Sequence, residues 1–196
     1  MKNSLKIRRI TGIALLIAVE VALGFLGNYV SIGQVNLNLA LIPIAVGACI
    51  FGPLCGLALG IINGLIALIA PATMAFFVPH NLIATIVVCL AKTGLAGLVA
   101  GFIYRGLKSK SELVAVILAS IAIPVVNTGL FIIGVFAFFM PVYEGWAGEG
   151  ANVYLYVITA TLTVNFLIEL VINAGLATTV HRIIKVVSKR QNNNHV

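Results

Sequence analysis

Charged residues are scarce in this sequence, and their scarcity excludes an ordinary soluble domain. They make up 9% of the 196 residues, whereas hydrophobic residues make up 61%. A soluble domain carries roughly 25% charged residues. A helix needs about 20 mostly apolar residues to cross a bilayer, so a chain of this length has room for about six crossings. The composition therefore predicts an all-α integral membrane protein that forms a single domain over residues 1–196.

The signatures of common enzymes and metal proteins are also missing. The sequence contains no Walker A motif, no HExxH, no GxSxG and no acidic metal motif. Its cysteines, Cys49, Cys55 and Cys89, form neither a disulfide framework nor a Cys/His metal pattern, and their apolar surroundings indicate small packing residues. We therefore expect no enzymatic activity, no cofactor and no metal site in this chain.

The apolar sequence divides into a predicted six-transmembrane-helix bundle. The spans cover residues 10–30, 39–51, 54–70, 81–104, 112–140 and 154–187. Eleven of the twelve basic residues form three clusters, at the N-terminus, after the fourth span and in the C-terminal tail. The loops 31–38, 71–80 and 141–153 carry none. The positive-inside rule therefore predicts that both termini are cytoplasmic, and the same distribution argues against a nucleic-acid partner.

The twelfth basic residue, Lys92, lies inside the fourth predicted span. At 1.5 Å per residue it is roughly 17 Å from Asn81, close to the bilayer midplane. A charge at that depth costs at least ~2.5–3.5 kcal/mol, so it needs a partner, a watery cavity or a ligand. One interpretation is an ion pair with Glu169 that only braces the helices. The other is a pocket for a small polar ligand.

Other polar residues in the spans favour the pocket. Thr161, Asn165, Glu169 and Asn173 recur every four residues on one face of the sixth span. In the fifth span Pro124, which permits a kink, precedes Asn127 and Thr128. Asn127 and Asn165 can converge with Lys92 near or above the midplane, while Glu169 and Asn173 lie deeper. We therefore expect a pocket open to the outside with Lys92 and Glu169 at its floor. The candidate binding residues are Lys92, Asn81, Asn127, Thr128, Asn165 and Glu169, with Gln34, Asn36 and Asn38 of the first outer loop.

Two further features leave alternatives open. The loop 31–38 alternates polar and apolar residues, which fits either a lid over a cavity or a solvated loop whose amides bond to its own backbone. Small residues recur every four positions in the first, third and fourth spans, which fits either internal helix packing or an exposed docking face. They are Ala14, Ala18 and Ala22; Gly56, Gly60 and Gly64; and Gly97 with Gly101. Glu20 in the first span could pair with Lys92, face the cavity or contact a partner.

Two segments of the sequence carry a family resemblance. One is the basic start followed by Ala14-Leu-Leu-Ile-Ala18, and the other is the segment 39–56, which reads LALIPIAVGACIFGPLCG. Together they resemble the substrate-binding S component of energy-coupling factor (ECF) vitamin transporters. The segment 124–129, PVVNTG, with Lys92 looks most like the pantothenate-type branch. The resemblance implies a multi-pass protein of the bacterial cytoplasmic membrane that captures a vitamin outside and topples to release it inside. Its implied partners are a transmembrane coupling subunit and two cytoplasmic ATPase subunits. The resemblance also implies coupling-subunit contacts at Ala14 and Ala18 and makes the loop 31–38 the lid. The small-residue spacing adds Ala22, Gly56 and Gly60 as further candidate contacts.

The chemistry of the candidate pocket fits an anionic vitamin. The Lys92 ammonium would pair with a carboxylate, and asparagine side chains would bind hydroxyl and amide groups, as pantothenate requires. Folate, also anionic, and riboflavin are the other vitamins considered. Two different functions also remain open. One is a stand-alone proton-coupled transporter that uses Glu20 or Glu169, and the other is a structural membrane subunit braced by Lys92 and Glu169.

Overall fold

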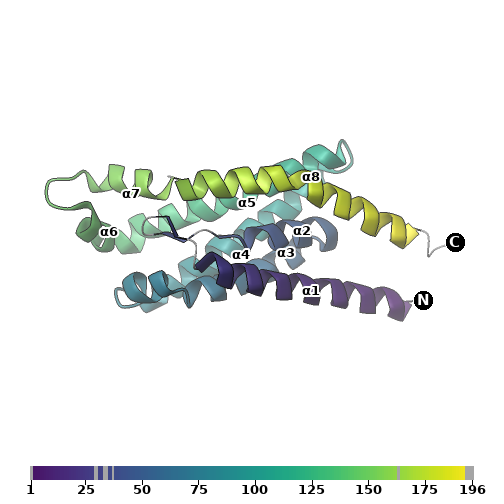
Figure 1. Ribbon diagram of the computed structural model, residues 1–196, viewed down its shortest axis with the longest axis horizontal. Coiled ribbons are helices and arrows are strands. Elements are labelled where there is room, and N and C mark those ends of the chain that lie inside the picture. Colours follow the sequence, from purple (N-terminus) through teal and green to yellow (C-terminus); the bar gives the residue numbers. More distant parts are fainter. Residues whose placement is uncertain (1, 29–30, 33–34, 37, 163, 193–196) are drawn as a thin grey trace.

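The computed structural model describes residues 2–28, 31–32, 35–36, 38–162 and 164–192. Four long helices run along the longest axis of the molecule (Figure 1): α1 (Lys2–Asn28), α4 (Leu82–Leu107), α5 (Glu112–Gly134) and α8 (Val164–Asn192). A pair of two-residue antiparallel strands, β1 (Ser31–Ile32) and β2 (Val35–Asn36), follows α1. Within these described residues, four helical stretches are long and apolar enough to cross a membrane. They are Lys6–Gly27, Leu82–Leu107, Glu112–Ala147 and Val153–Val186. The expectation of an all-α, multi-pass membrane protein is therefore confirmed.

The remaining elements are shorter and differ in places from the predicted spans. They are α2 (Leu41–Phe51), α3 (Pro53–Leu68), the π-helical turns η1 (Thr73–Phe77) and η2 (Val135–Phe139), α6 (Met140–Ala147) and α7 (Val153–Thr161). The segment 71–80, expected to be a loop, contains η1, and the fifth span continues through η2 into α6. The sixth span, expected as one helix, consists of α7 and α8. Periodicity does not reveal such π turns, because they shift the hydrogen bonding by only one residue.

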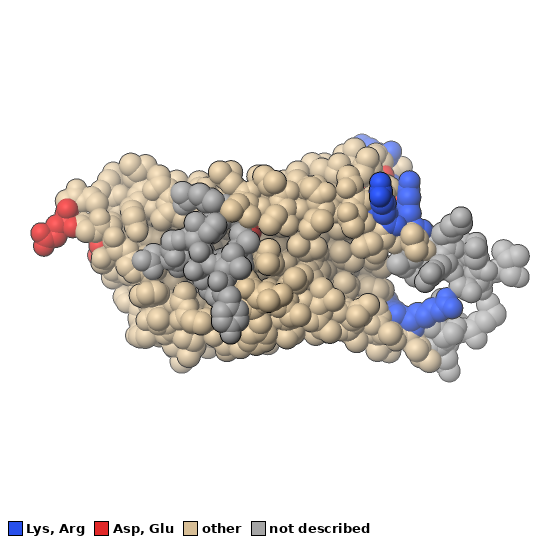
Figure 2. All heavy atoms as spheres, in the orientation of Figure 1, with Lys and Arg blue, Asp and Glu red and all other residues tan. Residues whose placement is uncertain are grey.

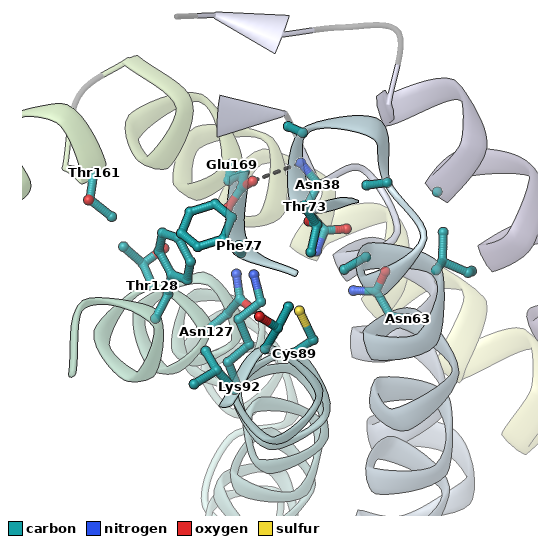
Figure 3. A pocket seen from close by; sticks show the side chains of 18 of the residues that line it. Asn38, Asn63, Thr73, Phe77, Cys89, Lys92, Asn127, Thr128, Thr161 and Glu169 are labelled. Atoms are coloured by element: carbon teal, nitrogen blue, oxygen red, sulfur yellow. Dashed lines mark hydrogen bonds between the residues drawn. The ribbon is translucent and has the colours of Figure 1, made fainter. Parts of the chain in front are cut away.

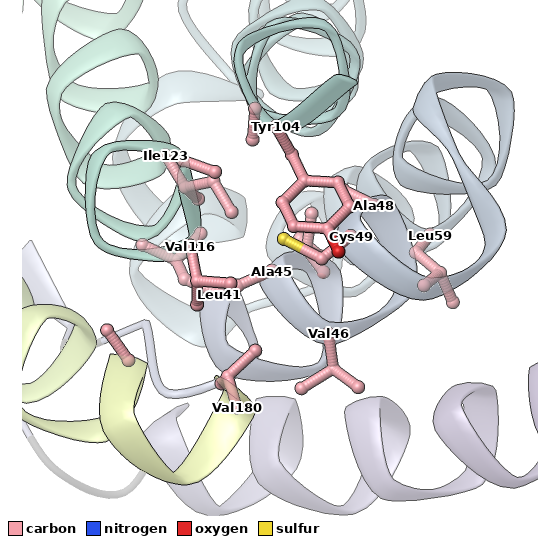
Figure 4. Close-up of a cluster of buried hydrophobic side chains, with 14 of the residues drawn as sticks. Leu41, Ala45, Val46, Ala48, Cys49, Leu59, Tyr104, Val116, Ile123 and Val180 are labelled. Carbon is pink, nitrogen blue, oxygen red and sulfur yellow. The ribbon is translucent and has the colours of Figure 1, made fainter. Parts of the chain in front are cut away.

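Helix α2 occupies the centre of the bundle. Nearly every residue from Leu41 to Cys49 is buried, as expected for a helix that is apolar all round. It packs among α1, α3, α4, α5 and α8. Figure 4 shows the resulting core, in which Leu41 and Ala45 of α2 meet Val116 of α5 and Val180 of α8. With 11 residues, α2 is only about 17 Å long, so it fills roughly half of a 30 Å hydrocarbon layer.

Glycines bring α3 and α4 into backbone contact. A Cβ atom added at Gly60 would lie 2.2 Å from the Thr93 carbonyl oxygen, and one added at Gly56 would lie 2.3 Å from the Gly97 carbonyl oxygen. The turn into α3 also needs glycine, because Gly52 has φ 99° and directly precedes Pro53 at the start of the helix. The glycine faces of the third and fourth spans are therefore internal packing faces that meet each other.

The ends of the bundle differ in charge. Both ends of the chain lie at the same end of the molecule (Figure 1), and the lysine and arginine side chains visible in Figure 2 gather there. Acidic side chains mark the opposite end in the same view, where α6 leads into α7. The segment that joins these two helices contains Gly148 and Gly150, both with positive φ. The bundle thus has a basic end and an acidic end, with the apolar helices between them.

Candidate functional site

The shortness of α2 leaves space at the end of the bundle away from the chain termini, and a pocket lies there. Its cavity has a volume of about 120 Å³. Its lining comes from the later parts of α1, α3 and α5, from the first half of α4, and from the region where α7 meets α8. Asn38, shortly before α2 begins, also lines it. The pocket therefore sits directly beyond the buried helix, inside the membrane-spanning body of the protein.

Lys92 projects into this pocket from α4, as Figure 3 shows. Its Nζ atom lies 4.7 Å from the centroid of the Phe131 ring on α5, close enough for a cation–π interaction. Among the described residues the one contact within 4.0 Å between a basic side chain and a carboxyl group joins His181 to Glu112, so no ion pair joins Lys92 to Glu169. The ammonium group is therefore free to bind an anionic group in the cavity.

Glu169 lines the same pocket from α8, and its side chain is only 6% exposed. Its Oε1 atom accepts a hydrogen bond of 2.8 Å from the backbone N–H of Asn38, drawn as the dashed line in Figure 3. One turn further along α8, Asn173 donates to the Glu169 carbonyl oxygen at 2.8 Å. The carboxylate therefore ties the segment before α2 to α8 while it faces the cavity.

Two asparagines present polar atoms that lack hydrogen-bond partners within the described part of the chain. They are Oδ1 of Asn127, which is 5% exposed, and Nδ2 of Asn63, which is 2% exposed. Both residues line the pocket. Since a buried polar group without a partner costs about 1–3 kcal/mol, these amides are suited to bind the polar groups of a ligand or ordered water.

Aromatic rings from the two π-helical turns form another wall of the pocket. Phe77 of η1 and Phe139 of η2 both line the cavity, and their rings meet edge to face with centroids 5.1 Å apart. Phe77 also contacts Phe131 and Trp146. Because π turns change the direction in which side chains leave a helix, they are common at functional sites. Here they turn two large apolar rings toward the polar groups of α4 and α5.

The structure brings together five of the predicted binding residues. They are Lys92, Asn127, Thr128, Glu169 and Asn38. Asn81 is exposed and does not line the cavity; its side chain caps α4 by accepting a hydrogen bond of 3.0 Å from the backbone N–H of Ala84. Gln34 and the side chains of Asn36 and Asn165 lie outside the described residues.

Sequence reasoning missed several pocket residues. Those with polar or aromatic side chains include Asn63, Thr73, Phe77, Thr85 and Phe131. Asn63 gave a usable signal, because it is the one strongly polar residue in the third span. The phenylalanines gave none, since aromatic residues in an apolar span are equally compatible with a lipid-facing position.

The small-residue faces of α1 and α3 differ in exposure. Ala14, Ala18 and Ala22 of α1 are all exposed. Gly56 and Gly60 of α3 are buried against the backbone of α4, so the structure places these two candidate docking residues in an internal packing face. Their backbone contacts with α4 leave no room for another protein. The alanine face of α1 is open to one.

Comparison with known proteins agrees with this arrangement. A family model described as the substrate-specific component of ECF transporters matches residues 8–181, a region that contains every residue lining the pocket. No curated protein and no solved structure matches the chain. Proteins of this family are the substrate-binding subunits of importers and associate with membrane coupling subunits and ATPases. Because the match covers well over half of its length, this chain belongs to the family of ECF transporter substrate-specific components.

Proposed function

We propose that this substrate-specific component captures an anionic vitamin, with pantothenate as the preferred candidate, in the pocket around Lys92. The observation that carries the proposal is the Lys92 ammonium, which faces a cavity without an ion pair among the described residues. A buried cation in a region of low dielectric binds a carboxylate strongly. Pantothenate offers a carboxylate for Lys92, and its hydroxyl and amide groups match the unpartnered amides of Asn127 and Asn63.

Folate and riboflavin fit this lining less well. Folate carries two carboxylates on its glutamate end, whereas Lys92 is the one basic residue in the lining. The phenylalanine rings of the pocket meet edge to face instead of forming two parallel walls for a flavin. These two vitamins are the alternatives that a binding screen must include.

The proposed orientation places six crossings in the cytoplasmic membrane, with both termini inside and the pocket toward the outer face. The gathering of basic side chains at the end where the chain begins and ends supports it (Figure 2), because such residues remain on the cytoplasmic side. In this orientation α2 and α3 together form the second and third crossings. Ala14, Ala18 and Ala22 would contact the coupling subunit, which works with two cytoplasmic ATPases, and the segment that ends at Asn38 would close over the ligand.

The test is a binding measurement on the purified chain. A thermal-shift screen against B vitamins identifies the ligand, because a ligand at 100 times its dissociation constant adds about 2.7 kcal/mol of stability. Titration of pantothenate then compares the parent with Lys92→Met, which keeps the apolar stem of the side chain and removes its charge. We expect the dissociation constant to rise more than tenfold, about 1.4 kcal/mol. Unchanged affinity in a folded variant would remove Lys92 as the carboxylate partner, and a shift with another vitamin alone would overturn pantothenate.

A further inference from the structure

The pocket carries opposite charges on different helices. Lys92 extends from α4, and Glu169 extends from α8 beside Asn38 (Figure 3). Their mutual attraction does not close the cavity, since no ion pair joins them in the described part of the chain. Instead, the Lys92 ammonium lies over the face of Phe131, and the Glu169 carboxylate is held by the backbone of Asn38. The cavity therefore presents an amine from α4 and a carboxyl group from α8, each held by a contact of its own.

Glu169 has acceptor capacity beyond its contact with Asn38. A carboxylate has about four lone-pair positions. The hydrogen bond from Asn38 uses one of them on Oε1, and Oε2 has no hydrogen bond within the residues that the structure describes. The residue as a whole is 6% exposed, and Oε2 is not among the fully buried atoms that lack a partner, so this oxygen is accessible from the cavity that Glu169 lines. Oε2 can therefore accept a hydrogen bond from a donor inside the cavity.

A ligand that fills the cavity must satisfy both Lys92 and Glu169. A ligand with anionic groups at both ends would bring one of them close to Glu169, and repulsion between like charges is strong in a cavity of low dielectric. A ligand that is apolar at one end would leave a buried carboxylate without a donor, which sites of this kind reject strongly. A hydroxyl, amide N–H or ammonium group at that end satisfies the acceptor.

We propose that Glu169 determines specificity by binding a hydrogen-bond donor of the ligand, so that the pocket selects molecules with an anionic group for Lys92 and a donor group at the other end. This proposal rests on the proposed function and narrows its substrate class. It also gives Glu169 a role distinct from helix bracing, because the predicted effect depends on the chemical structure of the ligand. Pantothenate meets the demand, since its carboxylate and its hydroxyl groups lie at opposite ends.

Two analogues of pantothenate test the two ends of the molecule one at a time. Pantothenol has an alcohol in place of the carboxylate and keeps both hydroxyls. N-(3,3-dimethylbutanoyl)-β-alanine keeps the carboxylate and amide and lacks both hydroxyls. Each ligand is titrated calorimetrically into the full-length parent, Lys92→Met and Glu169→Gln. Glutamine retains a carbonyl oxygen for the Asn38 N–H, and the melting temperature of each variant confirms folding.

We expect the parent to bind the analogue without hydroxyls about 10–100-fold more weakly than pantothenate. Glu169→Gln should weaken pantothenate binding about tenfold or more. Its effect on the analogue without hydroxyls should be less than threefold, because that ligand never contacts the carboxylate. Lys92→Met should show the complementary pattern, with pantothenate weakened and pantothenol unaffected.

The failures of the two proposals are distinguishable. Glu169 does not bind the donor end of the ligand if the parent binds pantothenate and the analogue without hydroxyls equally. The same conclusion follows if Glu169→Gln weakens the binding of both ligands by the same factor. In either case the result for Lys92 still stands. The comparison of ligands on the parent decides this even if Glu169→Gln fails to fold. If the parent does not bind pantothenate at all, the proposed substrate is wrong and the role assigned to Glu169 falls with it.

Discussion

A single added methyl group at Gly60 tests whether the glycine face of α3 serves packing or docking. In Gly60→Ala the new Cβ would lie 2.2 Å from the Thr93 carbonyl oxygen, 2.6 Å from its carbon and 2.7 Å from Cα of Gly94. All three are backbone atoms, so no side-chain rotation relieves the contact. Since non-bonded carbon atoms prefer ~3.5–4.0 Å, α3 and α4 would have to separate by about 1 Å or more.

The magnitude follows from two opposing effects. Overpacking of this kind costs about 1–3 kcal/mol, while alanine is better than glycine in a helix by about 0.5–1 kcal/mol. We expect a net loss of about 1–2 kcal/mol for Gly60→Ala. The matched control is Gly129→Ala in α5, where an added Cβ meets no atom within 4 Å. The control should gain up to about 1 kcal/mol, which leaves a difference of about 1–3 kcal/mol between the variants.

The assay is thermal unfolding of both purified variants in the same detergent, followed by capture with the coupling subunit. At about 2–4 °C per kcal/mol, Gly60→Ala should melt roughly 2–12 °C below Gly129→Ala. At a temperature where both are folded, both should still associate with the coupling subunit. The packing argument would be refuted if Gly60→Ala melted like the control and had lost that association, because the glycine face would then be the docking surface.

Two further predictions concern α1 and α4. Ala18→Phe on the exposed face of α1 should reduce capture by the coupling subunit at least tenfold and leave vitamin affinity unchanged. The control is Val171→Phe, at an exposed position of α8. Equal capture of both variants would place the interface elsewhere. Asn81→Ala should lower stability by about 1 kcal/mol through loss of the helix cap, whereas Asn81→Ser should retain most of it. Neither change at Asn81 should alter vitamin affinity, and a tenfold loss in calorimetric titration would return this residue to the binding site.

The charged and strongly polar residues of the pocket were predictable because lipid penalises them. Lys92, Asn127 and Glu169 each lie in an apolar span, so each had to face the protein interior or a cavity. Helix geometry then predicted that they could lie near one another, and all three line the same pocket. Membrane insertion therefore provides a filter that a soluble protein lacks, because water tolerates an exposed asparagine and lipid does not.

The same filter gives no information about residues near the ends of spans or about apolar ones. Asn81 was a candidate for the pocket, yet at the start of α4 its side chain accepts a hydrogen bond from the helix backbone instead. Phe77 and Phe139 reach the pocket through π turns, which periodicity does not predict. Spacing identifies a face of a helix, but local hydrogen bonding decides where the side chain goes.

Helix α1 shows how neighbouring helices resolve what spacing leaves open. Ala18 and Glu20 are two residues apart, or about 200° around the helix, so they must point in nearly opposite directions. The structure exposes Ala18 with Ala14 and Ala22 and buries Glu20 completely, one turn before Gly24, which lines the pocket. Of the roles considered for Glu20, contact with a docking partner on the alanine face is therefore incompatible with the geometry. Its carboxylate has no hydrogen-bond partner among the described residues, so whatever satisfies it acts from within the bundle, on the side of α1 that faces the pocket.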